Sequence, residues 1–377
     1  MKIAIIRQKY VNYGGAESFV QQYTEWLAEH GHEIHIFAHR WTPSAKENIH
    51  LRPVPVLTFN SLLRTLSFVW NAARAVRREE FDVVQSHEKT WCQDVYRAGD
   101  GCHRQWLVER GRHAPFSKRL LTALSPLHWL ILALERRLVM DPGLKKIVAI
   151  SEMVRQDFLR HYPIAEDKCA VVYNGVPLKR FHPGNKARLR ASVRRELDTP
   201  EEEVVILFVG SGFERKGLRF LLASLSRLEK RGWRLWVVGK GKHRRYLEFA
   251  EKGVRDRVHF LDPVDDVEKY YAAADLFILP SIYEPFGNVY LEALASGLPV
   301  IASRMSGAAE IIQHGEDGLI LQDPADTDEI ARHIGTLFDE ETRARMGLKA
   351  RELAERYTPE RNAREMLAIY EDVIRSR

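Results

Sequence analysis

The sequence has little cysteine and no long apolar run. Its 377 residues contain three cysteines, Cys92, Cys102 and Cys169, an odd number without metal-ligand spacing, so reduced thiols are expected rather than a disulfide scaffold. Nowhere does the chain approach the roughly 20 uncharged apolar residues that a membrane span requires. Charges flank a very short apolar run in the first ten residues, which is typical of a first β-strand and not of a signal peptide. These absences predict a cytoplasmic protein.

Familiar cofactor motifs are missing as well. The glycine-rich segment 210–217 does not have the spacing of a dinucleotide fingerprint, and it lacks the terminal Lys-Ser/Thr of a P-loop. Asp262, Asp265 and Asp266 could pass for metal ligands, but solvated loop acids are the stronger interpretation, so neither a metal nor a cofactor is expected. No nucleic-acid-binding module is recognisable.

The net charge of +6 is unevenly distributed. Residues 1–180 contain 26 Lys and Arg against 18 Asp and Glu, whereas the remainder contains 31 against 33. A basic first half indicates an anionic partner for that half, such as nucleic acid, an acidic lipid surface or a phosphorylated substrate. A solvated basic face without a partner is the alternative.

Short apolar runs alternate with amphipathic helical segments along almost the whole chain, which predicts parallel sheets covered by helices on both faces. The expected strands are residues 3–6, 34–37, 82–85, 147–150, 170–173, 204–209, 235–238, 258–261, 276–279 and 299–302. The expected helices include residues 16–30, 62–78, 153–161, 218–230 and 359–376.

A charged stretch with two prolines, at 178–202, joins two complete strand–helix series. We therefore expect an α/β protein with two Rossmann-like, doubly wound domains, 1–180 and 181–358, and a C-terminal helix, 359–377, as a candidate to pack back on the first domain. Ligands of such sheets bind at the carboxyl ends of the strands, so the two domains would face a central cleft.

The segment 280–300 is the richest in chemical information. A helix is expected to start near Asn288, a favourable cap residue, and its first-turn amides would bind an anion such as a phosphate. Glu292 lies one turn further on the same face, and Glu284 precedes the helix. Beside an anion site, two carboxylates are suited to accept hydrogen bonds from the hydroxyls of a ribose and a sugar. Ordinary solvated acids are the alternative.

Two further loops place glycine at the start of an expected helix. In the loop 210–217, Gly212 and its neighbouring glycines allow close approach of the backbone to a ligand, while Arg215 and Lys216 supply positive charge for a diphosphate. Gly14 and Gly15 open the first helix, where their amides would face the same phosphates from the other domain.

Taken in order, these motifs resemble the retaining family-four glycosyltransferases over nearly the whole chain. The resemblance is carried by an E-x7-E spacing, an Arg-Lys pair after G-S-G, an early Gly-Gly and a Y-N-G-V, which are Glu284 and Glu292, Arg215 and Lys216, Gly14 and Gly15, and residues 173–176. Within the family, residues 83–102 resemble the bacterial lipopolysaccharide core glucosyltransferases, which add the first glucose to an inner-core heptose. The resemblance implies the GT-B fold, a UDP-hexose donor with glucose favoured, and a lipid-linked acceptor in the heptose region of the lipopolysaccharide core.

At the matching positions, the resemblance also implies roles. Arg215 and Lys216 would neutralise the departing diphosphate, Glu292 would accept from the ribose, and Glu284 would accept from the donor sugar. Backbone amides would help to bind that sugar at Phe286, Gly287 and Asn288. With retention and no identified nucleophile, the resemblance favours front-face attack, in which a donor phosphate oxygen receives the acceptor's proton.

Four further positions follow from the same resemblance. Gly15 would close over the phosphates, and the loop 261–266 would hold the base. His87 falls where many family members place a histidine near the donor sugar, and a structural histidine is the alternative. Asp100 is a further candidate beside the sugar, with helix capping or a salt bridge as the alternative.

Residues 103–137 combine basic and aromatic side chains with an apolar helical stretch. Basic residues near anionic lipid contribute about 1 kcal/mol each, and aromatic side chains suit the membrane interface. We expect this segment to rest on the inner face of the plasma membrane, and the resemblance implies the same; a core helix at 120–138 with solvated charges is the alternative. The expected contacts are Arg104, Trp106, Arg110, Arg112, Lys118 and Arg119.

Two other functions fit part of the pattern. A nucleotide-sugar hydrolase or epimerase with the same fold would consume the donor without an acceptor, although the further acid–base residues of an epimerase are not identifiable. A nucleic-acid-binding protein would use the basic first half, but the glutamates at the expected cleft argue against it.

Overall fold

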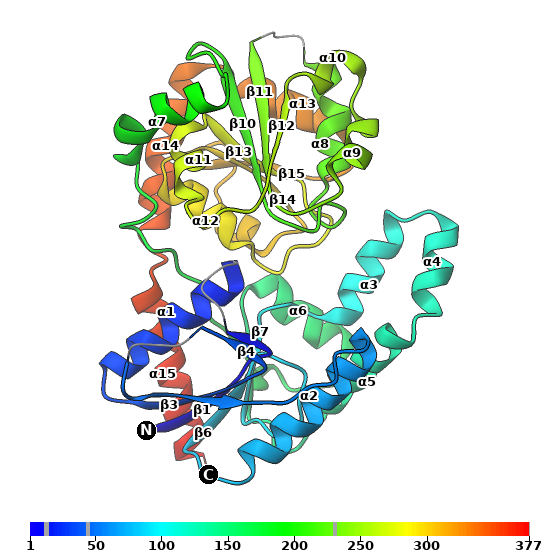
Figure 1. Ribbon diagram of the computed structural model, residues 1–377, viewed down its shortest axis with the longest axis vertical. Coiled ribbons are helices and arrows are strands. Elements are labelled where there is room, and N and C mark those ends of the chain that lie inside the picture. The colour runs from blue at the N-terminus through cyan, green and yellow to red at the C-terminus, as the bar shows by residue number, and fades with distance from the viewer. Residues whose placement is uncertain (11–14, 43–45, 229–231, 377) are drawn as a thin grey trace. The chain divides into compact units, whose positions relative to one another are not determined.

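The computed structural model describes residues 1–10, 15–42, 46–228 and 232–376, apart from the side chains of residues 10 and 15–19. The chain forms two compact units (Figure 1), which we call the first and the second domain. The first domain comprises Met1–Asn174 and Pro359–Arg377, and the second comprises Gly175–Thr358.

Over the described residues, the first domain is built on a parallel sheet with the strand order β5-β3-β1-β6-β7-β8-β9. Its strands are β1 (Lys2–Ile6), β3 (Glu33–Ala38), β5 (Ile49–Pro53), β6 (Val83–Ser86), β7 (Val95–Ala98), β8 (Lys146–Ala149) and β9 (Cys169–Val171), with a separate short pair, β2 (Lys9–Tyr10) and β4 (Arg40–Trp41). Its helices are α1 (Gly15–Glu29), α2 (Ser61–Val76), α3 (His103–Arg112), α4 (Phe116–Ala123), α5 (Pro126–Val139), α6 (Glu152–His161), the 3-10 turn η1 (Glu166–Lys168) and α15 (Pro359–Arg375).

The alternation of side chains along β1 assigns helices to the two faces of this sheet. Ile3 and Ile5 share a core cluster with residues of α1 and α15. Ala4 and Ile6, which point the opposite way, share a cluster with residues of α2. Both faces of the sheet are therefore covered, which explains why the apolar run of β1 is unbroken.

The second domain has a parallel sheet of its own, with the order β12-β11-β10-β13-β14-β15 over the described residues. Its strands are β10 (Val204–Val209), β11 (Trp233–Val238), β12 (Val258–Leu261), β13 (Leu276–Leu279), β14 (Val300–Ser303) and β15 (Gly318–Leu321). Its helices and 3-10 turns are α7 (Asn185–Glu196), α8 (Leu218–Ser224), η2 (Leu225–Arg227), α9 (His243–Tyr246), η3 (Leu247–Phe249), α10 (Lys252–Arg255), α11 (Glu268–Ala273), α12 (Asn288–Ala295), η4 (Gly307–Glu310), α13 (Thr327–Thr336) and α14 (Glu340–Ala354).

The predicted α/β class is confirmed, because both domains are doubly wound parallel sheets. Two details differ from the prediction. The strands β5, β7 and β15 and the short pair β2 and β4 were not predicted. The prediction missed β7 because its buried sequence includes Arg97. The helix predicted over 218–230 is shorter: α8 ends at Ser224, a 3-10 turn follows, and Leu228 has an extended backbone.

The boundary between the domains lies after Asn174 rather than after residue 180. The amide of Val176 donates to the carbonyl oxygen of Tyr357 at 2.9 Å, and Arg351 donates to the carbonyl oxygen of Phe181 at 3.0 Å. These bonds attach residues 175–181 to the second domain. The C-terminal helix α15 belongs to the first domain, where its apolar side chains join the core cluster around β1.

Candidate active site

The candidate site of the second domain lies where the strand order of its sheet reverses. β10 and β13 are neighbours, and the chain continues from them to opposite edges of the sheet. In open α/β sheets, ligands bind in the crevice at the carboxyl ends of two such strands. The loop after β10 carries Arg215 and Lys216, and the loop after β13 carries Glu284. The sequence therefore delivers its charged loop residues to the place where this fold binds ligands.

Glu284 is held by both cations. Lys216 Nζ donates to Glu284 Oε2 at 2.9 Å, and Arg215 donates to Glu284 Oε1 at 3.0 Å. Lys216 and Glu284 are buried, whereas about a third (34%) of the Arg215 side chain remains exposed. Two cations and one anion leave one positive charge in a preformed arrangement, which suits the anionic part of a ligand.

The charges of this cluster decide its protonation. Burial alone would raise the pKa of Glu284, but the charges of Arg215 and Lys216 and their hydrogen bonds outweigh burial and lower that pKa to about 2. For Lys216, burial is the largest influence and lowers its pKa, while Glu284 acts in the opposite direction. Glu284 therefore stays ionised at neutral pH in spite of its burial.

The glycines of the loop after β10 serve the cluster itself. Gly210 has φ +141°, and a Cβ there would lie 2.5 Å from Lys216 Cε. Gly210 was expected to allow close approach of a ligand. In the structure, the aliphatic part of the Lys216 side chain occupies the space beside Gly210. Gly212 has φ +76° with open space around its Cβ position, so its left-handed backbone is what favours glycine there.

Helix α12 starts as predicted, but its cap differs. Asn288 is the first helical residue, and the cap position belongs to Gly287. Gly287 has a φ of +87°, a left-handed conformation in which a residue with a side chain would be strained. As a glycine, Gly287 supplies no side-chain cap to the first amides of α12. The positive end of its dipole is therefore directed at the loop that contains Glu284. Phe286 is buried, and its carbonyl oxygen accepts from the amide of Ala308 at 3.2 Å.

Glu292 points its carboxylate at a partner that the sequence did not reveal. The hydroxyl of Tyr271, on α11, donates to Glu292 Oε2 at 2.9 Å. Burial raises the pKa of Glu292, and the hydrogen bond from Tyr271 opposes this shift. Tyr271 thus orients the carboxylate expected at the ribose. Tyr271 stands in a segment with the aromatic and apolar pattern of a core helix, and nothing in that pattern indicates this contact.

In the first domain, His87 belongs to a buried network. It follows β6, and its Nε2 lies 2.9 Å from Nε2 of Gln85, whose side-chain oxygen accepts from Tyr370 of α15 at 2.7 Å. Burial, followed by the charges of Arg7 and Arg97, lowers the pKa of His87 well below its usual value. His87 is therefore neutral, with Nε2 accepting from the Gln85 amide.

Asp100 is exposed in the turn before α3 and does not cap that helix. The first amides of α3, those of His103 and Arg104, donate instead to the buried carboxylate of Glu135 on α5, at 2.7 and 3.1 Å. Lys89 lies 3.5 Å from the same carboxylate. Glu135 is distant in the sequence from the helix that it caps, so no local pattern predicted this role.

The remaining glycines of the prediction lie at the start of the chain. Gly15 is the first residue of α1, and Gly14 lies outside the described residues. Together with His87 and Asp100, Gly15 belongs to the first domain, whereas Arg215, Lys216, Glu284 and Glu292 belong to the second. Of the predicted site residues, the structure thus brings Arg215, Lys216 and Glu284 into direct contact.

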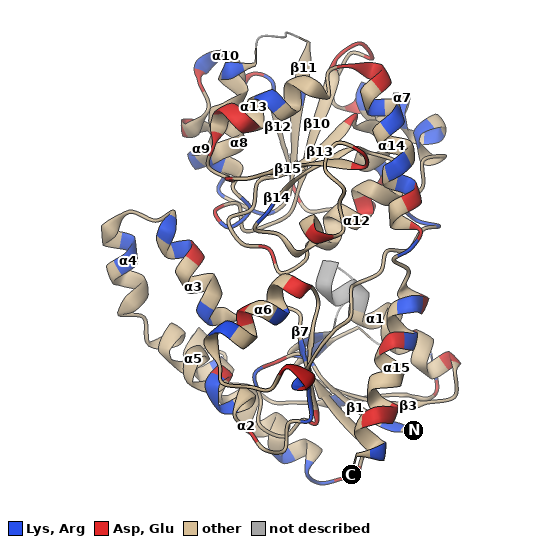
Figure 2. Cartoon of the chain, turned by 180° about the vertical axis from the view of Figure 1, so that it is seen from behind, with Lys and Arg blue, Asp and Glu red and all other residues tan. Residues whose placement is uncertain are grey.

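The basic segment, residues 103–137, contains the helices α3, α4 and α5, and the stretch 120–138 is divided between two of them instead of forming one core helix. α4 ends at Ala123 and α5 begins at Pro126, and α5 is buried only from Leu134 onward. In Figure 2, the ribbon of α3 and α4 is blue at the positions of Lys and Arg. Of the expected contacts, Arg104, Arg112 and Arg119 are exposed, and Trp106, Arg110 and Lys118 are partly buried.

Among the described residues, no helix combines the length and the apolar character needed to cross a lipid bilayer.

Among the described residues, one group of potential metal ligands comes together, which the sequence did not indicate because it depends on strand pairing. Glu33 and His35 on β3 lie beside His50 on β5. However, His35 Nε2 lies 2.7 Å from Glu33, and Arg52 donates to His35 Nδ1 at 3.2 Å. The group is a hydrogen-bonded network of side chains and lies near the amino ends of its strands, away from the edge where ligands bind. Of the three predicted loop acids, all exposed, Asp266 pairs with Lys269 at 2.9 Å.

Comparison with known proteins finds glycosyltransferase sequence models that match both domains. The sequence model described as "Glycosyltransferase Family 4" matches residues 13–180, and that described as "Glycosyl transferases group 1" matches residues 203–340. The lipopolysaccharide glucosyltransferase WaaG of Escherichia coli (strain K12) is 28% identical over 328 residues, which are 86% of each chain.

Two solved structures show the same fold. The crystal structure of WaaG, a glycosyltransferase involved in lipopolysaccharide biosynthesis, matches with a TM-score of 0.84 and 25% identity, over 97% of this chain and 99% of that chain. Anabaena Alr3699/HepE in complex with UDP-glucose matches with a TM-score of 0.73 and 19% identity, over 99% of this chain and 100% of that chain.

Two doubly wound domains, with paired cations and carboxylates at the switch point of the second, define a glycosyltransferase of the GT-B type. The chain belongs to the family-four glycosyltransferases and is related to the lipopolysaccharide core glucosyltransferases.

Proposed function

We propose that the protein transfers a hexose, with glucose favoured, from a UDP-sugar to a lipid-linked saccharide, with retention of anomeric configuration. The observation that carries this proposal is the cluster of Arg215, Lys216 and Glu284 at the switch point of the second domain. Its net positive charge lies near the start of α12, whose cap residue is Gly287, so the cations and the positive end of the helix dipole both support binding of a diphosphate there.

The chemistry follows from where charge develops. As the bond between the anomeric carbon and the diphosphate oxygen breaks, the sugar becomes oxocarbenium-like and the diphosphate gains negative charge. Arg215 and Lys216 interact more strongly with that charge in the transition state than in the ground state, and Glu284 fixes both cations in advance. Each carboxylate oxygen of Glu284 keeps a lone pair with which to accept from a sugar hydroxyl.

Retention is assigned to front-face attack. The acceptor hydroxyl forms its bond to the anomeric carbon on the face that the diphosphate leaves, and its proton passes to a phosphate oxygen of the departing nucleotide. No protein nucleophile and no metal is required, since the two cations supply the positive charge. Full activity in EDTA is expected; loss of activity in EDTA with recovery in Mg²⁺ would overturn the metal-free assignment. His87 and Asp100 remain candidates for contacts with the sugar.

The proposed donor and acceptor are based on what related proteins are named for. The related E. coli protein is named a lipopolysaccharide glucosyltransferase, and the Anabaena structure of the same fold is titled as a complex with UDP-glucose. We assign UDP-glucose as the first donor to test and the heptose region of lipopolysaccharide core as the acceptor, bound by the first domain. The Tyr271–Glu292 pair supports a ribose contact, because its carboxylate is oriented and ionisable.

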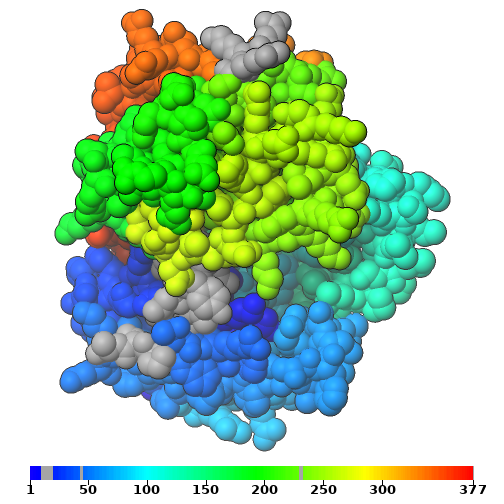
Figure 3. All heavy atoms as spheres, turned by 45° about the horizontal axis from the view of Figure 1, so that its top comes forward, coloured from blue at the N-terminus to red at the C-terminus, as the bar shows by residue number. Residues whose placement is uncertain are grey.

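We further propose that the protein works at the cytoplasmic face of the plasma membrane, attached through α3, α4 and α5. Phe116, Leu120, Leu121, Leu124 and Trp129 are exposed, with Phe116 79% exposed. Figure 3 shows the cyan surface of these helices facing outward. Exposed apolar side chains next to basic ones are the pattern of a surface that rests on anionic lipid.

The deciding experiment measures nucleoside diphosphate released from a panel of nucleotide sugars, with and without a heptose-terminated lipopolysaccharide core. Release from UDP-glucose that depends on the core acceptor is expected. Release that needs no acceptor would support a nucleotide-sugar hydrolase instead. If UDP-galactose or UDP-N-acetylglucosamine is the sugar consumed, the transferase stands and the glucose assignment is wrong.

A further inference from the structure

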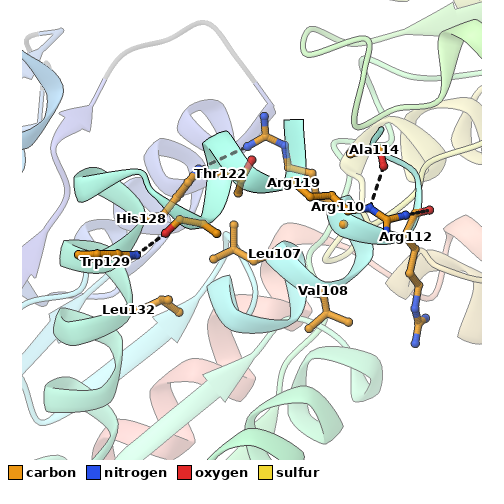
Figure 4. Close-up of a pocket in the computed structure, with 12 residues that line it drawn as sticks. Leu107, Val108, Arg110, Arg112, Ala114, Arg119, Thr122, His128, Trp129 and Leu132 are labelled. Atoms are coloured by element: carbon orange, nitrogen blue, oxygen red, sulfur yellow. Dashed lines mark hydrogen bonds between the residues drawn. The ribbon is translucent and has the colours of Figure 1, made fainter. Parts of the chain in front are cut away.

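The helices of the basic segment enclose a groove within the first domain. Its cavity volume is about 630 Å³, which lies within the range of small-molecule sites. Leu107 and Val108 of α3 and Trp129 and Leu132 of α5 line it. Figure 4 shows these apolar side chains around the hollow, with Arg110 and Arg119 close by.

The wall formed by α4 is held only weakly by the rest of the domain. None of the eight described residues of α4 is buried. In Figure 1, α3 and α4 extend away from the sheet of the first domain. Leu120 and Leu121 are 51% and 69% exposed beside the groove. Exposed leucines next to an apolar groove are typical of a surface that another molecule covers.

The rim of the groove is positively charged. Arg112 is neutralised by Glu109, at 2.9 Å. Arg119 donates to the carbonyl oxygen of Ala114 at 2.8 Å, and Arg110 lies 3.3 Å from Nε2 of His128. Burial and the charge of Arg110 lower the pKa of His128, so this acceptor is neutral. Arg110 and Arg119 thus keep their charge at the mouth of an apolar groove.

We propose that this groove binds one anionic phospholipid of the membrane, with an acyl chain along Leu107, Trp129 and Leu132 and the phosphate at Arg110 and Arg119. This inference deepens the membrane attachment proposed above and rests on it. It differs from simple adsorption, because a single lipid molecule enters the protein with defined stoichiometry. An apolar chain matches the lining, and an anionic head group matches the two arginines at the rim.

Gly111 offers a substitution that fills the groove. It lines the cavity, and a Cβ added there meets no heavy atom within 4 Å. The Cβ of a leucine therefore has open space at this position of the groove lining, and leucine is a better helix former than glycine. The matched control is Ala133→Leu, which adds the same apolar side chain at an exposed position of α5 that does not line the cavity.

The test is calorimetric titration of the full chain with lauroyl-lysophosphatidylglycerol below its critical micelle concentration. We expect one molecule bound per chain, with affinity at least about tenfold lower for glycerophosphoglycerol, which has no chain, and for lauroyl-lysophosphatidylcholine, which has no net charge. Gly111→Leu lowers the affinity at least about tenfold, and Ala133→Leu leaves it unchanged. Equal binding by Gly111→Leu and wild type, or no saturable binding, overturns the inference.

Flotation with vesicles of phosphatidylglycerol and phosphatidylcholine separates this inference from the proposal on which it rests. If the wild type does not float with anionic vesicles, the membrane attachment itself fails. If it floats but Gly111→Leu leaves the titration unchanged, the surface attaches to membranes and the groove does not take a lipid. Unchanged melting temperatures of both variants show that any loss comes from the groove.

Discussion

Glu284 has a second role beside the expected contact with the sugar, because it also holds the two cations of the site. Both of its oxygens accept from cations, so this carboxylate positions Arg215 and Lys216 before any ligand arrives. A residue that fixes the geometry of two others affects catalysis even where it does not touch the reacting atoms. The cations and their anchor are therefore separate targets for mutation.

Removing either cation should slow the reaction. We expect Lys216→Ala and Arg215→Ala each to lower the turnover number for diphosphate release by roughly 10²–10³, because each withdraws positive charge from the leaving group. Lys252→Ala, an exposed lysine on α10 of the same domain, serves as the control and should leave turnover unchanged. Near-normal turnover in both site variants would contradict the assignment of the cluster.

The cluster also predicts how stability depends on pH. The pKa of Glu284 is about 2 in the folded protein against a usual 4.5, so its ionised form contributes stability above pH 4.5 that is lost as pH falls toward 2. The difference corresponds to about 3 kcal/mol. Urea unfolding between pH 5 and 2 should show this loss in the wild type and a shallower one in Glu284→Gln. Glu248→Gln, at an exposed position, should behave as the wild type; equal slopes in all three would contradict the prediction.

At the level of helices, α4 has apolar residues that packing within its own domain does not explain. Its apolar residues remain exposed, whereas those of α15 enter a core. The amphipathic pattern predicted the helix at 359–376, and within residues 103–137 it predicted an apolar helical stretch without the bounds of α4. An amphipathic pattern does not distinguish a helix that packs against its own chain from a helix whose apolar face stays exposed.

Membrane attachment through α4 predicts a sensitivity that depends on position. Leu121 on α4 and Leu348 on α14 are 69% and 70% exposed. Leu121→Asp should reduce co-sedimentation with anionic vesicles at least about tenfold, because it replaces an inserted apolar side chain by a charge that anionic lipid repels. Leu348→Asp should have no effect. Equal binding of both variants, or equal binding to neutral vesicles, would speak against α4 as the contact.

The elements that were predictable are those whose local sequence decides their environment. β10 and β13 have the predicted bounds, because an apolar run between turn signals leaves little alternative to a buried strand. β7 was missed because Arg97 is buried there through a bond to the distant Asn174, at 2.7 Å. The cap of α3 by Glu135 and the orientation of Glu292 by Tyr271 are of the same kind, since each partner lies far along the chain.

For the charged loops, the sequence indicated which residues matter but not how they pair. Arg215 and Lys216 were expected to face a ligand and Glu284 to face a sugar. The structure shows the three bound to one another. A spacing of 68 residues between Lys216 and Glu284 becomes a contact only because β10 and β13 are neighbours in the sheet.

At the scale of the whole molecule, each domain should respond to mutation of its own core. Met366 on α15 and Met346 on α14 are both buried, in the first and the second domain respectively. Each methionine-to-alanine change should cost about 2–5 kcal/mol of stability. In hydrogen–deuterium exchange, Met366→Ala should accelerate exchange in β1 and β3, and Met346→Ala should do so in α12. Faster exchange in the other domain would show that the two cores are not separate.

The position of α15 has a consequence for synthesis of the protein on the ribosome. The core around β1 needs Met366 and Tyr370, which are translated after the whole of the second domain. At about 5–20 residues per second, the first domain waits on the order of 10–40 s for its last helix. The first domain to be translated is therefore the last to be completed, and the sheet face that α15 covers stays incompletely covered until the end of the chain is released.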